Sequence, residues 1–477
     1  MTVPVFPPVQ QQPIQPVVGA IVDPVPAVVL DVDVARPVPA IDGYRDGRRV
    51  AAAWILVRAF TEPLGQSIVE VPAEGVPAAE LAARIEREYG AAVRERVAAA
   101  GGDPAQGVPP DGVRITTTPP YVAQRAAVLA DAPEITVVVC TREHPEPLRL
   151  TLESLVTQEY PAYRILVVDN APRTDATARV VRSFAGRGVD IEYLLEPRPG
   201  LSRARNAAVA AAPGEILAFT DDDVVVDRYW LAEVARGFAE VPDADVVTGL
   251  ILPAELETPA QVWFEEYGGH SKGRGFTPAV FRRRPGSPYL EPTPGVPRQH
   301  HLYPLPPFGA GANMVFLPGV AEAIGGFDEA LGAGTPAMGS EDTLALMRVL
   351  HDGGTIAYRP TALVRHYHRR DLPGLAKQLT GYGTGLTAAY LGLLRQDPRT
   401  VGSLLSLVPS ALRDLRAGSA REAGLSERFP RQLLGLNRSG MLRGPLAYLR
   451  GRRALRRGHP DARTPDTPHP DVRRPDA

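Results

Sequence analysis

Cysteine is almost absent from this sequence of 477 residues, and neither sign of charge dominates it. The single cysteine, Cys140, excludes an internal disulfide and a thiolate-rich zinc cluster, and fits a reducing cytoplasm. A formal net charge of -2 gives no overall excess of positive charge with which to bind nucleic acid. We therefore expect a cytoplasmic protein that does not bind nucleic acid, long enough for more than one folded unit.

Long apolar runs are also missing. No stretch reaches the ~18 apolar residues that a membrane-spanning helix needs, and the nearest approach, VGSLLSLVPSAL, contains a proline. The N-terminal residues lack the basic start and continuous apolar segment of a secretory signal. Frequent prolines there predict a disordered lead over residues 1–26.

Two segments separate this lead from the main domain. Over residues 27–100, strand-like alternation at Leu30 and Val32 precedes apolar residues at every fourth position from Leu81 to Val97. This pattern predicts a small α/β or α+β appendix. Residues 101–133 are rich in glycine and proline and lose periodicity, which predicts a linker.

Apolar strands and amphipathic segments then alternate. ITVVVC and YRILVVDN are of buried-strand length, and IEYLLE and EILAFTDDD continue the series with helix-compatible sequence between them. Such alternation predicts a doubly wound, mostly parallel sheet with helices on both faces, here over residues 134–370. Ligands of such sheets bind beyond the carboxyl ends of the strands, where this sequence places polar residues.

Three consecutive carboxylates end the last of these strands. Side chains two residues apart on a strand point the same way, so Asp221 and Asp223 share one side and Asp222 faces the other. Close carboxylates repel each other, and a cation removes that cost. Oxygen ligands favour Mg²⁺ or Mn²⁺, so this D-x-D pattern predicts a divalent-metal site, with a solvated acidic turn as the alternative.

Eight motifs in order resemble family 2 glycosyltransferases of the GT-A fold, over about residues 135–370. They are VVVCTRE, ILVVDNAPRTDAT, PGLSRARNAA, ILAFTDDDVVVD, GAGANMVF, GGFDE, GSEDT and ALVRHYHR. The resemblance implies transfer of a sugar from a nucleotide diphosphate to an acceptor hydroxyl, with inversion at the anomeric carbon. The donor would be a UDP-, GDP- or TDP-sugar, and the acceptor a saccharide, a lipid-linked sugar or a small molecule.

The resemblance also assigns roles by position. Asp221 and Asp223 would bind the metal, Asp221 would also contact the ribose, and Asp169 would bond the base. The full set of implied nucleotide-sugar contacts is Thr141, Arg142, Glu143, Asp169, Asn170, Arg203, Arg205, Asn206, Asp221 and Asp222. Turn and helix-capping chemistry is the alternative for the residues at strand ends, and a surface arginine pair is the alternative for Arg203 and Arg205.

Catalysis requires a base, because an inverting transfer must remove the proton of the attacking hydroxyl. The ED pair of the family falls on Glu341 and Asp342, which makes Asp342 the predicted base and Glu341 its neighbour at the donor or acceptor. His366 matches a histidine that completes metal ligation in the family, with His368 as a phosphate or acceptor contact. Both acids also suit a first helical turn, and a lone histidine is commonly structural.

Two regions have less definite predictions. Residues 250–308 are irregular and contain Trp263 among several aromatic residues, which suggests an acceptor-binding rim, with simple packing as the alternative for Trp263. Residues 371–457 show helical spacing of leucines and end in an arginine-rich segment. We expect these helices to pack on the catalytic domain, with peripheral contact to the inner face of a membrane as the alternative. Residues 458–477 are predicted to be disordered.

Two other functions compete with sugar transfer. A nucleotidyltransferase that makes nucleotide-sugars would use a similar sheet, but such enzymes carry a glycine-rich and basic segment after the first strand, where this chain has TREHPEPL. A binding protein that had lost catalysis would not need the acids and the histidine at Asp221, Asp223, Asp342 and His366.

Overall fold

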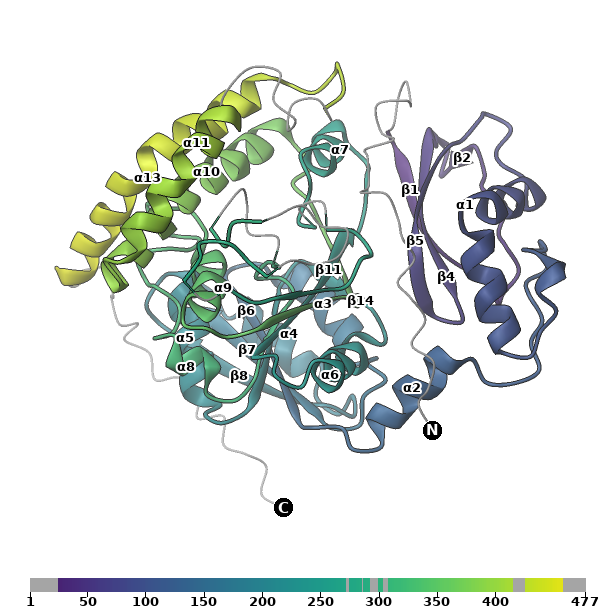
Figure 1. Ribbon diagram of the computed structural model, residues 1–477, viewed down its shortest axis with the longest axis horizontal. Helices are drawn as coiled ribbons and strands as arrows, with labels where there is room; N and C mark the ends of the chain where they lie inside the picture. Colours follow the sequence, from purple (N-terminus) through teal and green to yellow (C-terminus); the bar gives the residue numbers. More distant parts are fainter. Residues whose placement is uncertain are drawn as a thin grey trace.

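The computed structural model describes residues 25–271, 274–284, 286–291, 299–302, 308–414 and 425–457 (Figure 1). The predicted disordered lead, apart from residues 25 and 26, and the predicted tail over residues 458–477 lie outside this range. Within it, the chain forms a large sheet with helices, a smaller N-terminal unit and a C-terminal group of helices.

A nine-stranded sheet forms the centre of the molecule, in the order β10-β14-β11-β13-β9-β6-β7-β8 with β12 also paired to β14. Pairing is parallel through β9-β6-β7-β8 and between β11 and β14, and antiparallel at β10, β12 and β13. The strands are β6 (Ile135–Thr141), β7 (Tyr163–Asn170), β8 (Asp190–Glu196), β9 (Ile216–Asp221), β10 (Val224–Val226), β11 (Val246–Pro253), β12 (Ala279–Phe281), β13 (Met314–Phe316) and β14 (Ile356–His366).

Helices cover both faces of this sheet, because alternate residues of the buried strands point to opposite sides. On β6, Val137 and Val139 pack with α3, α4 and α6, whereas Val138 packs with α5, α8 and α9. The helices are α3 (Pro145–Leu155), α4 (Ala176–Ser183), α5 (Leu201–Ala211), α6 (Trp230–Glu240), α8 (Val320–Ala323) and α9 (Glu341–His351). The predicted α/β class is confirmed, with a sheet that is mixed rather than uniformly parallel.

The N-terminal unit has a sheet and a core of its own. Its strands are β1 (Ala27–Asp33), β4 (Ala52–Ala59) and β5 (Glu62–Glu70), with the short hairpin β2 (Tyr44–Arg45) and β3 (Arg48–Arg49). Helix α1 (Ala78–Ala99) buries Leu81, Ile85, Tyr89, Val93 and Val97 against this sheet. The predicted linker contains η2 (Pro104–Gln106) and α2 (Pro120–Leu129), and α2 packs on α6.

Contacts between this unit and the large sheet lie close to β10 and β14. Arg58 Nη2 lies 2.5 Å from the Asp227 carboxylate, and Arg365 Nη2 lies 2.8 Å from Asp31 Oδ1. Asp227 directly follows β10, and Arg365 belongs to β14. The N-terminal unit therefore contacts β10, which directly follows the acidic turn, and β14, which ends at His366.

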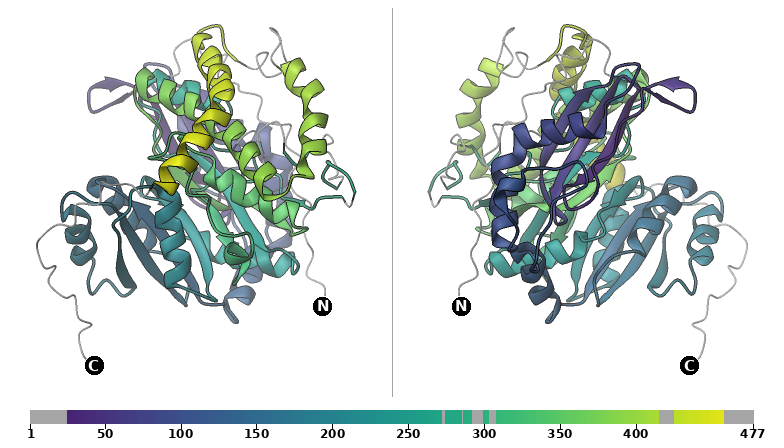
Figure 2. Two further views of the ribbon diagram at one scale, coloured as in Figure 1. Left: turned by 90° about the vertical axis from the view of Figure 1, so that its left-hand side faces the viewer. Right: turned by 90° about the vertical axis from the view of Figure 1, so that its right-hand side faces the viewer.

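The C-terminal group consists of α10 (Leu372–Gln396), α11 (Thr400–Asp414) and α13 (Gln432–Arg456). Helices α10 and α13 run side by side and α10 also contacts α9 (Figures 1 and 2). Their backbones approach closely because Gly383, Gly440 and Gly444 lie in the contact, where any side chain would collide with the facing helix. Among the described residues, no helix is long and apolar enough to span a bilayer.

Candidate functional site

The acidic turn after β9 lies at the carboxyl edge of the sheet, as the alternation of strands and helices predicts. Asp221 ends β9, whose neighbours are β6 and β13, and the turn leads directly into β10. The three carboxylates have different partners. One ligand atom each from Asp221, Asp223 and His366 lies within 4.8 Å of the others, while Asp222 contacts a separate group.

Asp222 is held by the loop after β6. Thr141 Oγ1 donates to its Oδ2 at 2.5 Å, and His144 Nδ1 lies 3.2 Å from its Oδ1. Burial raises the pKa of Asp222, and its hydrogen bond raises the pKa of His144. Sequence reasoning missed His144. The sequence feature that could have indicated His144 is its place in the TREH segment, directly after the first strand of the domain.

Asp223 and His366 meet because of strand register. Val224 of β10 pairs with His366 of β14, so the residue before Val224 lies beside the imidazole. His366 Nε2 is 3.2 Å from Asp223 Oδ1, and both side chains are buried. This places the predicted third metal ligand next to the predicted pair, although the two segments are far apart in the sequence.

Arg205 joins Asp221, one of the predicted metal ligands, to the start of α9. Its guanidinium is buried, with Nη2 3.2 Å from Asp221 Oδ1 and Nη1 2.7 Å from Glu341 Oε1. Loss of water around the carboxylates raises the pKa of Asp221 to about 6 and that of Glu341 to about 7, and Arg205 opposes both shifts. The arginine therefore offsets part of the repulsion in a strongly acidic site.

Asp342 is more accessible than Glu341. Its Oδ2 accepts a hydrogen bond from the Gly311 N–H at 2.7 Å, and its Oδ1 accepts from the Thr343 N–H at 2.6 Å. Gly311 belongs to the GAGANM segment, and a side chain at this position would collide with the Arg205 guanidinium. Sequence reasoning missed Gly311 as a site residue. Its contact with Asp342 joins segments that only the fold brings together.

The predicted nucleotide contacts at the ends of β6 and β7 differ in accessibility. Arg142 is exposed and Thr141 is buried against Asp222. Asp169 is fully buried, and its Oδ2 accepts a hydrogen bond from the Tyr193 hydroxyl at 2.9 Å. Burial raises the pKa of Asp169 to about 6. A nucleobase would reach this carboxylate only after covering side chains such as Tyr193 move.

Four other predicted contacts support loops around the site. Asn170 Oδ1 accepts from the Gly200 N–H, and Glu143 Oε1 accepts from the Arg173 N–H. Asn206 exchanges two hydrogen bonds with the backbone of Phe327. Arg203 pairs with Glu329, 3.1 Å from its Oε2. These residues shape the approach to α5, and their contact with a donor stays a prediction.

Part of the chain is similar in sequence to known glycosyltransferases. Residues 136–325 match the sequence model of glycosyl transferase family 2. The chain is 28% identical over 267 residues to the pre-mycofactocin glycosyltransferase of Mycobacterium tuberculosis, which covers 55% of this chain and 48% of that protein. It is 33% identical over 140 residues to the succinoglycan biosynthesis protein ExoM of Rhizobium meliloti, covering 29% and 44%.

A solved structure with a similar fold is the mannosyltransferase PcManGT from Pyrobaculum calidifontis, in complex with GDP-Man and Mn²⁺. The similarity has a TM-score of 0.39 and 18% identity, and covers 70% of this chain and 93% of that one. The chain spans about half the length of the curated relatives it matches. The family match places residues 136–325 in the glycosyltransferase class. The predicted resemblance to family 2 glycosyltransferases is confirmed over this segment.

Proposed function

We propose that this chain is an inverting, metal-dependent glycosyltransferase that uses a nucleotide-diphosphate sugar. The observation that carries the proposal is the meeting of Asp221, Asp223 and His366 at the carboxyl edge of the sheet. Arg205 connects this group to Glu341, which directly precedes the accessible Asp342. A cation ligand set therefore lies beside a carboxylate that can act as a base.

The ligand set fits Mn²⁺ or Mg²⁺. Two carboxylates and one imidazole are donors that Mn²⁺ accepts, and three protein ligands leave positions for phosphate oxygens. The raised pKa of Asp221 shows that ionised acids are costly here, a cost that a cation would remove. When bound, the metal would stabilise the negative charge of the departing nucleotide diphosphate.

Asp342 would take the proton of the acceptor hydroxyl. The N–H groups of Gly311 and Thr343 fix the orientation of its carboxylate, while Glu341 is held by Arg205 and shielded from solvent. Inversion needs a single base and no covalent sugar intermediate, which suits one accessible carboxylate. Thr141 and Arg142 would flank the nucleoside of a UDP-, GDP- or TDP-sugar, and Asp169 would bond its base after the side chains that cover this carboxylate move.

The acceptor would bind toward residues 250–308, which include α7 (Pro259–Glu266) and the half-buried Trp263. The C-terminal helices would bring this region to the inner face of a membrane, as a peripheral contact. Helices α11 and α13 expose Leu405, Leu442 and Leu446, and exposed arginines such as Arg443 and Arg450 lie beside them on α13. Exposed leucines with neighbouring cations suit an anionic lipid surface.

The test is turnover of a donor panel. Purified protein is incubated with UDP-, GDP- and TDP-sugars and Mn²⁺ or EDTA, and released nucleotide is measured. We expect one donor class to be consumed with Mn²⁺ and spared with EDTA. If no donor is bound or consumed with metal present, the proposal is wrong.

The Asp342→Asn variant tests the base. Loss of general-base catalysis should lower turnover by about 10²- to 10⁴-fold, while donor binding measured by calorimetry stays within about twofold of wild type. The matched control is Asp352→Asn, at the opposite end of α9 and exposed. Wild-type turnover in Asp342→Asn would refute the assignment.

A further inference from the structure

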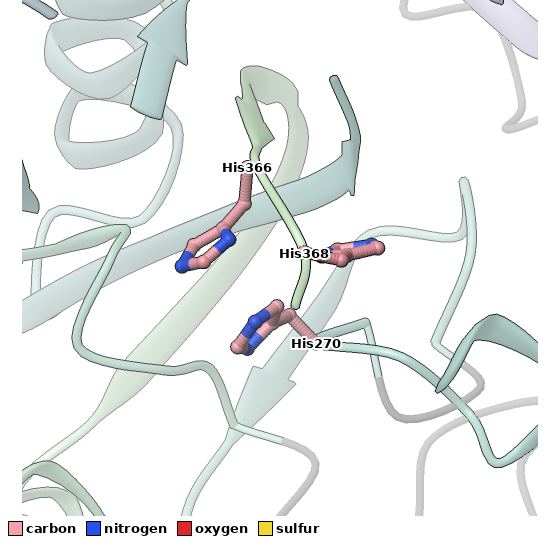
Figure 3. A group of neighbouring side chains, drawn as sticks. All are labelled: His270, His366 and His368. Atoms are coloured by element: carbon pink, nitrogen blue, oxygen red, sulfur yellow. The ribbon is translucent and has the colours of Figure 1, made fainter. Parts of the chain in front are cut away.

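A second group of possible metal ligands lies next to the acidic site. His270, His366 and His368 each place one ring nitrogen within 4.8 Å of the other two (Figure 3). The ring centroids of His270 and His366 are 4.3 Å apart, and those of His270 and His368 are 5.6 Å apart. His270 follows α7, whereas the other two residues lie at and just beyond the end of β14.

A carboxylate lies beside each of two of these imidazoles, and the one beside His368 is in hydrogen-bond contact with it. His368 Nε2 lies 2.7 Å from Glu265 Oε1, and His366 Nε2 lies 3.2 Å from Asp223 Oδ1. A neutral imidazole that donates through Nε2 carries its lone pair on Nδ1. Both Nδ1 atoms are buried and have no hydrogen-bond partner among the described residues. In metal sites, a carboxylate commonly contacts the ring nitrogen of a histidine that does not bind the metal, and so fixes the orientation of the ring.

The surroundings select the kind of ion. Phe264 packs edge-on against His270 and His368, with centroids 4.9 Å and 4.8 Å away. Three imidazole nitrogens beside an aromatic ring are poor ligands for Mg²⁺ and good ligands for Zn²⁺. We propose that His270, His366 and His368 form a second cation site that binds Zn²⁺ or a similar transition metal. Tetrahedral Zn²⁺ needs nitrogens roughly 3.4 Å apart, so modest side-chain rotation would complete it.

His366 belongs to both groups of ligands, and this has a consequence that rests on the proposed function. A neutral imidazole has one lone pair, so His366 binds either through Nδ1 to the histidine site or through Nε2 to the acidic site. Zn²⁺ at the histidine site therefore withdraws His366 from the metal of Asp221 and Asp223. Zn²⁺ should weaken Mn²⁺ binding without occupying the Mn²⁺ position.

The first test measures Zn²⁺ alone. The whole chain is titrated with Zn²⁺ in the presence of a chromogenic chelator, with no other divalent metal and no donor present. We expect one Zn²⁺ per chain, and Co²⁺ should give the intense visible absorption of a tetrahedral nitrogen site. Binding of Zn²⁺ does not depend on turnover, so this result is independent of the proposed function.

Variants identify the ligands. His270→Ala should weaken Zn²⁺ binding by at least about 100-fold, and Glu265→Gln, which leaves all ligands in place, by about 10- to 100-fold. The matched control is His351→Gln, because His351 is also paired to a carboxylate, 2.9 Å from Asp397, but belongs to neither group. Circular dichroism checks that each variant folds.

Three results would overturn the proposal. The first is the absence of Zn²⁺ binding in wild type. The second is a His270→Ala affinity equal to that of the His351→Gln control. The third is loss of Zn²⁺ in Asp221→Asn with full retention in His270→Ala, which would place Zn²⁺ in the acidic site. For competition, Mn²⁺ affinity followed by electron paramagnetic resonance should fall when Zn²⁺ is added to wild type and not when it is added to His270→Ala.

Discussion

At the scale of single residues, the site concentrates carboxylates at one edge of a sheet and offsets them with few cations. Asp221 and Glu341 share the buried Arg205, Asp223 lies beside His366, and Asp222 has His144. Desolvation raises the pKa of several of these acids. Burial of these carboxylates in their charged form therefore costs free energy that a bound cation would offset.

Asp169 gives a stability test at this scale. Its pKa in the folded state is about 6, against an ordinary value near 4. Between these values the folded protein retains a proton that the unfolded chain has lost, so stability falls as pH rises through about 6. We expect the thermal midpoint of wild type to drop more from pH 5 to pH 7.5 than that of Asp169→Asn.

Scanning calorimetry at matched ionic strength measures this difference. Other acids with raised pKa, such as Asp221, are present in both proteins and cancel in the comparison. Equal pH slopes for wild type and Asp169→Asn would show that the Asp169 carboxyl titrates normally.

The sequence predicted contacts between individual residues only where those residues are close together in the chain. The two-residue repeat of a strand separates Asp222 from Asp221 and Asp223, and the structure gives these carboxylates different partners. The link between Arg205 and Glu341 spans 136 positions, and no local pattern encodes it. His270 has the same difficulty, because its segment lacks periodicity and reaches β14 only through the fold.

At the scale of elements, the C-terminal helices use two kinds of surface. Glycines join α10 to α13, and α10 also contacts α9, while the outward faces of α11 and α13 keep large apolar side chains exposed. Leu442 is 86% exposed and Leu405 is 65% exposed, so neither stabilises the fold.

Vesicle binding tests this surface. Each leucine that enters a lipid interface contributes about 1.5 to 3 kcal/mol. A Leu442→Gln, Leu446→Gln double variant should therefore bind anionic phosphatidylglycerol vesicles at least about tenfold more weakly in a sedimentation assay. Tyr44→Gln removes another exposed apolar side chain, on β2 in the N-terminal unit, and is the control. Equal sedimentation of both variants would contradict a lipid-binding role for α13.

At the scale of the whole molecule, the N-terminal unit contacts the two strands next to the candidate metal ligands. Arg58 holds Asp227 after β10 and Asp31 holds Arg365 of β14, and these two strands position Asp223 and His366. The patterns of strands and helices predicted both units from local sequence. They did not predict the contact between the units, because the sequence of a strand does not indicate which distant residue its charged side chains will pair with.

Removal of the ion pair between Arg58 and Asp227 tests whether the N-terminal unit stabilises the position of β10. Arg58→Ala leaves Asp227 largely buried and unpaired, so we expect a loss of about 3 kcal/mol or more in the free energy of unfolding. Mn²⁺ affinity should also fall, because β10 is less well fixed. Arg48→Ala is the control, since its pair with Glu257 also joins the units but is 79% exposed on the arginine side. Denaturant titration and Mn²⁺ titration measure both effects, and unchanged Mn²⁺ binding in Arg58→Ala would refute the coupling.

The place of β14 in the sheet has a further consequence during synthesis. It is the last strand of the domain to leave the ribosome, yet it lies between β10 and β11. A nascent chain that ends before residue 356 leaves one edge of β11 open and β10 without its partner. Open strand edges pair readily with other chains, so this interval is the most aggregation-prone stage in the production of the protein.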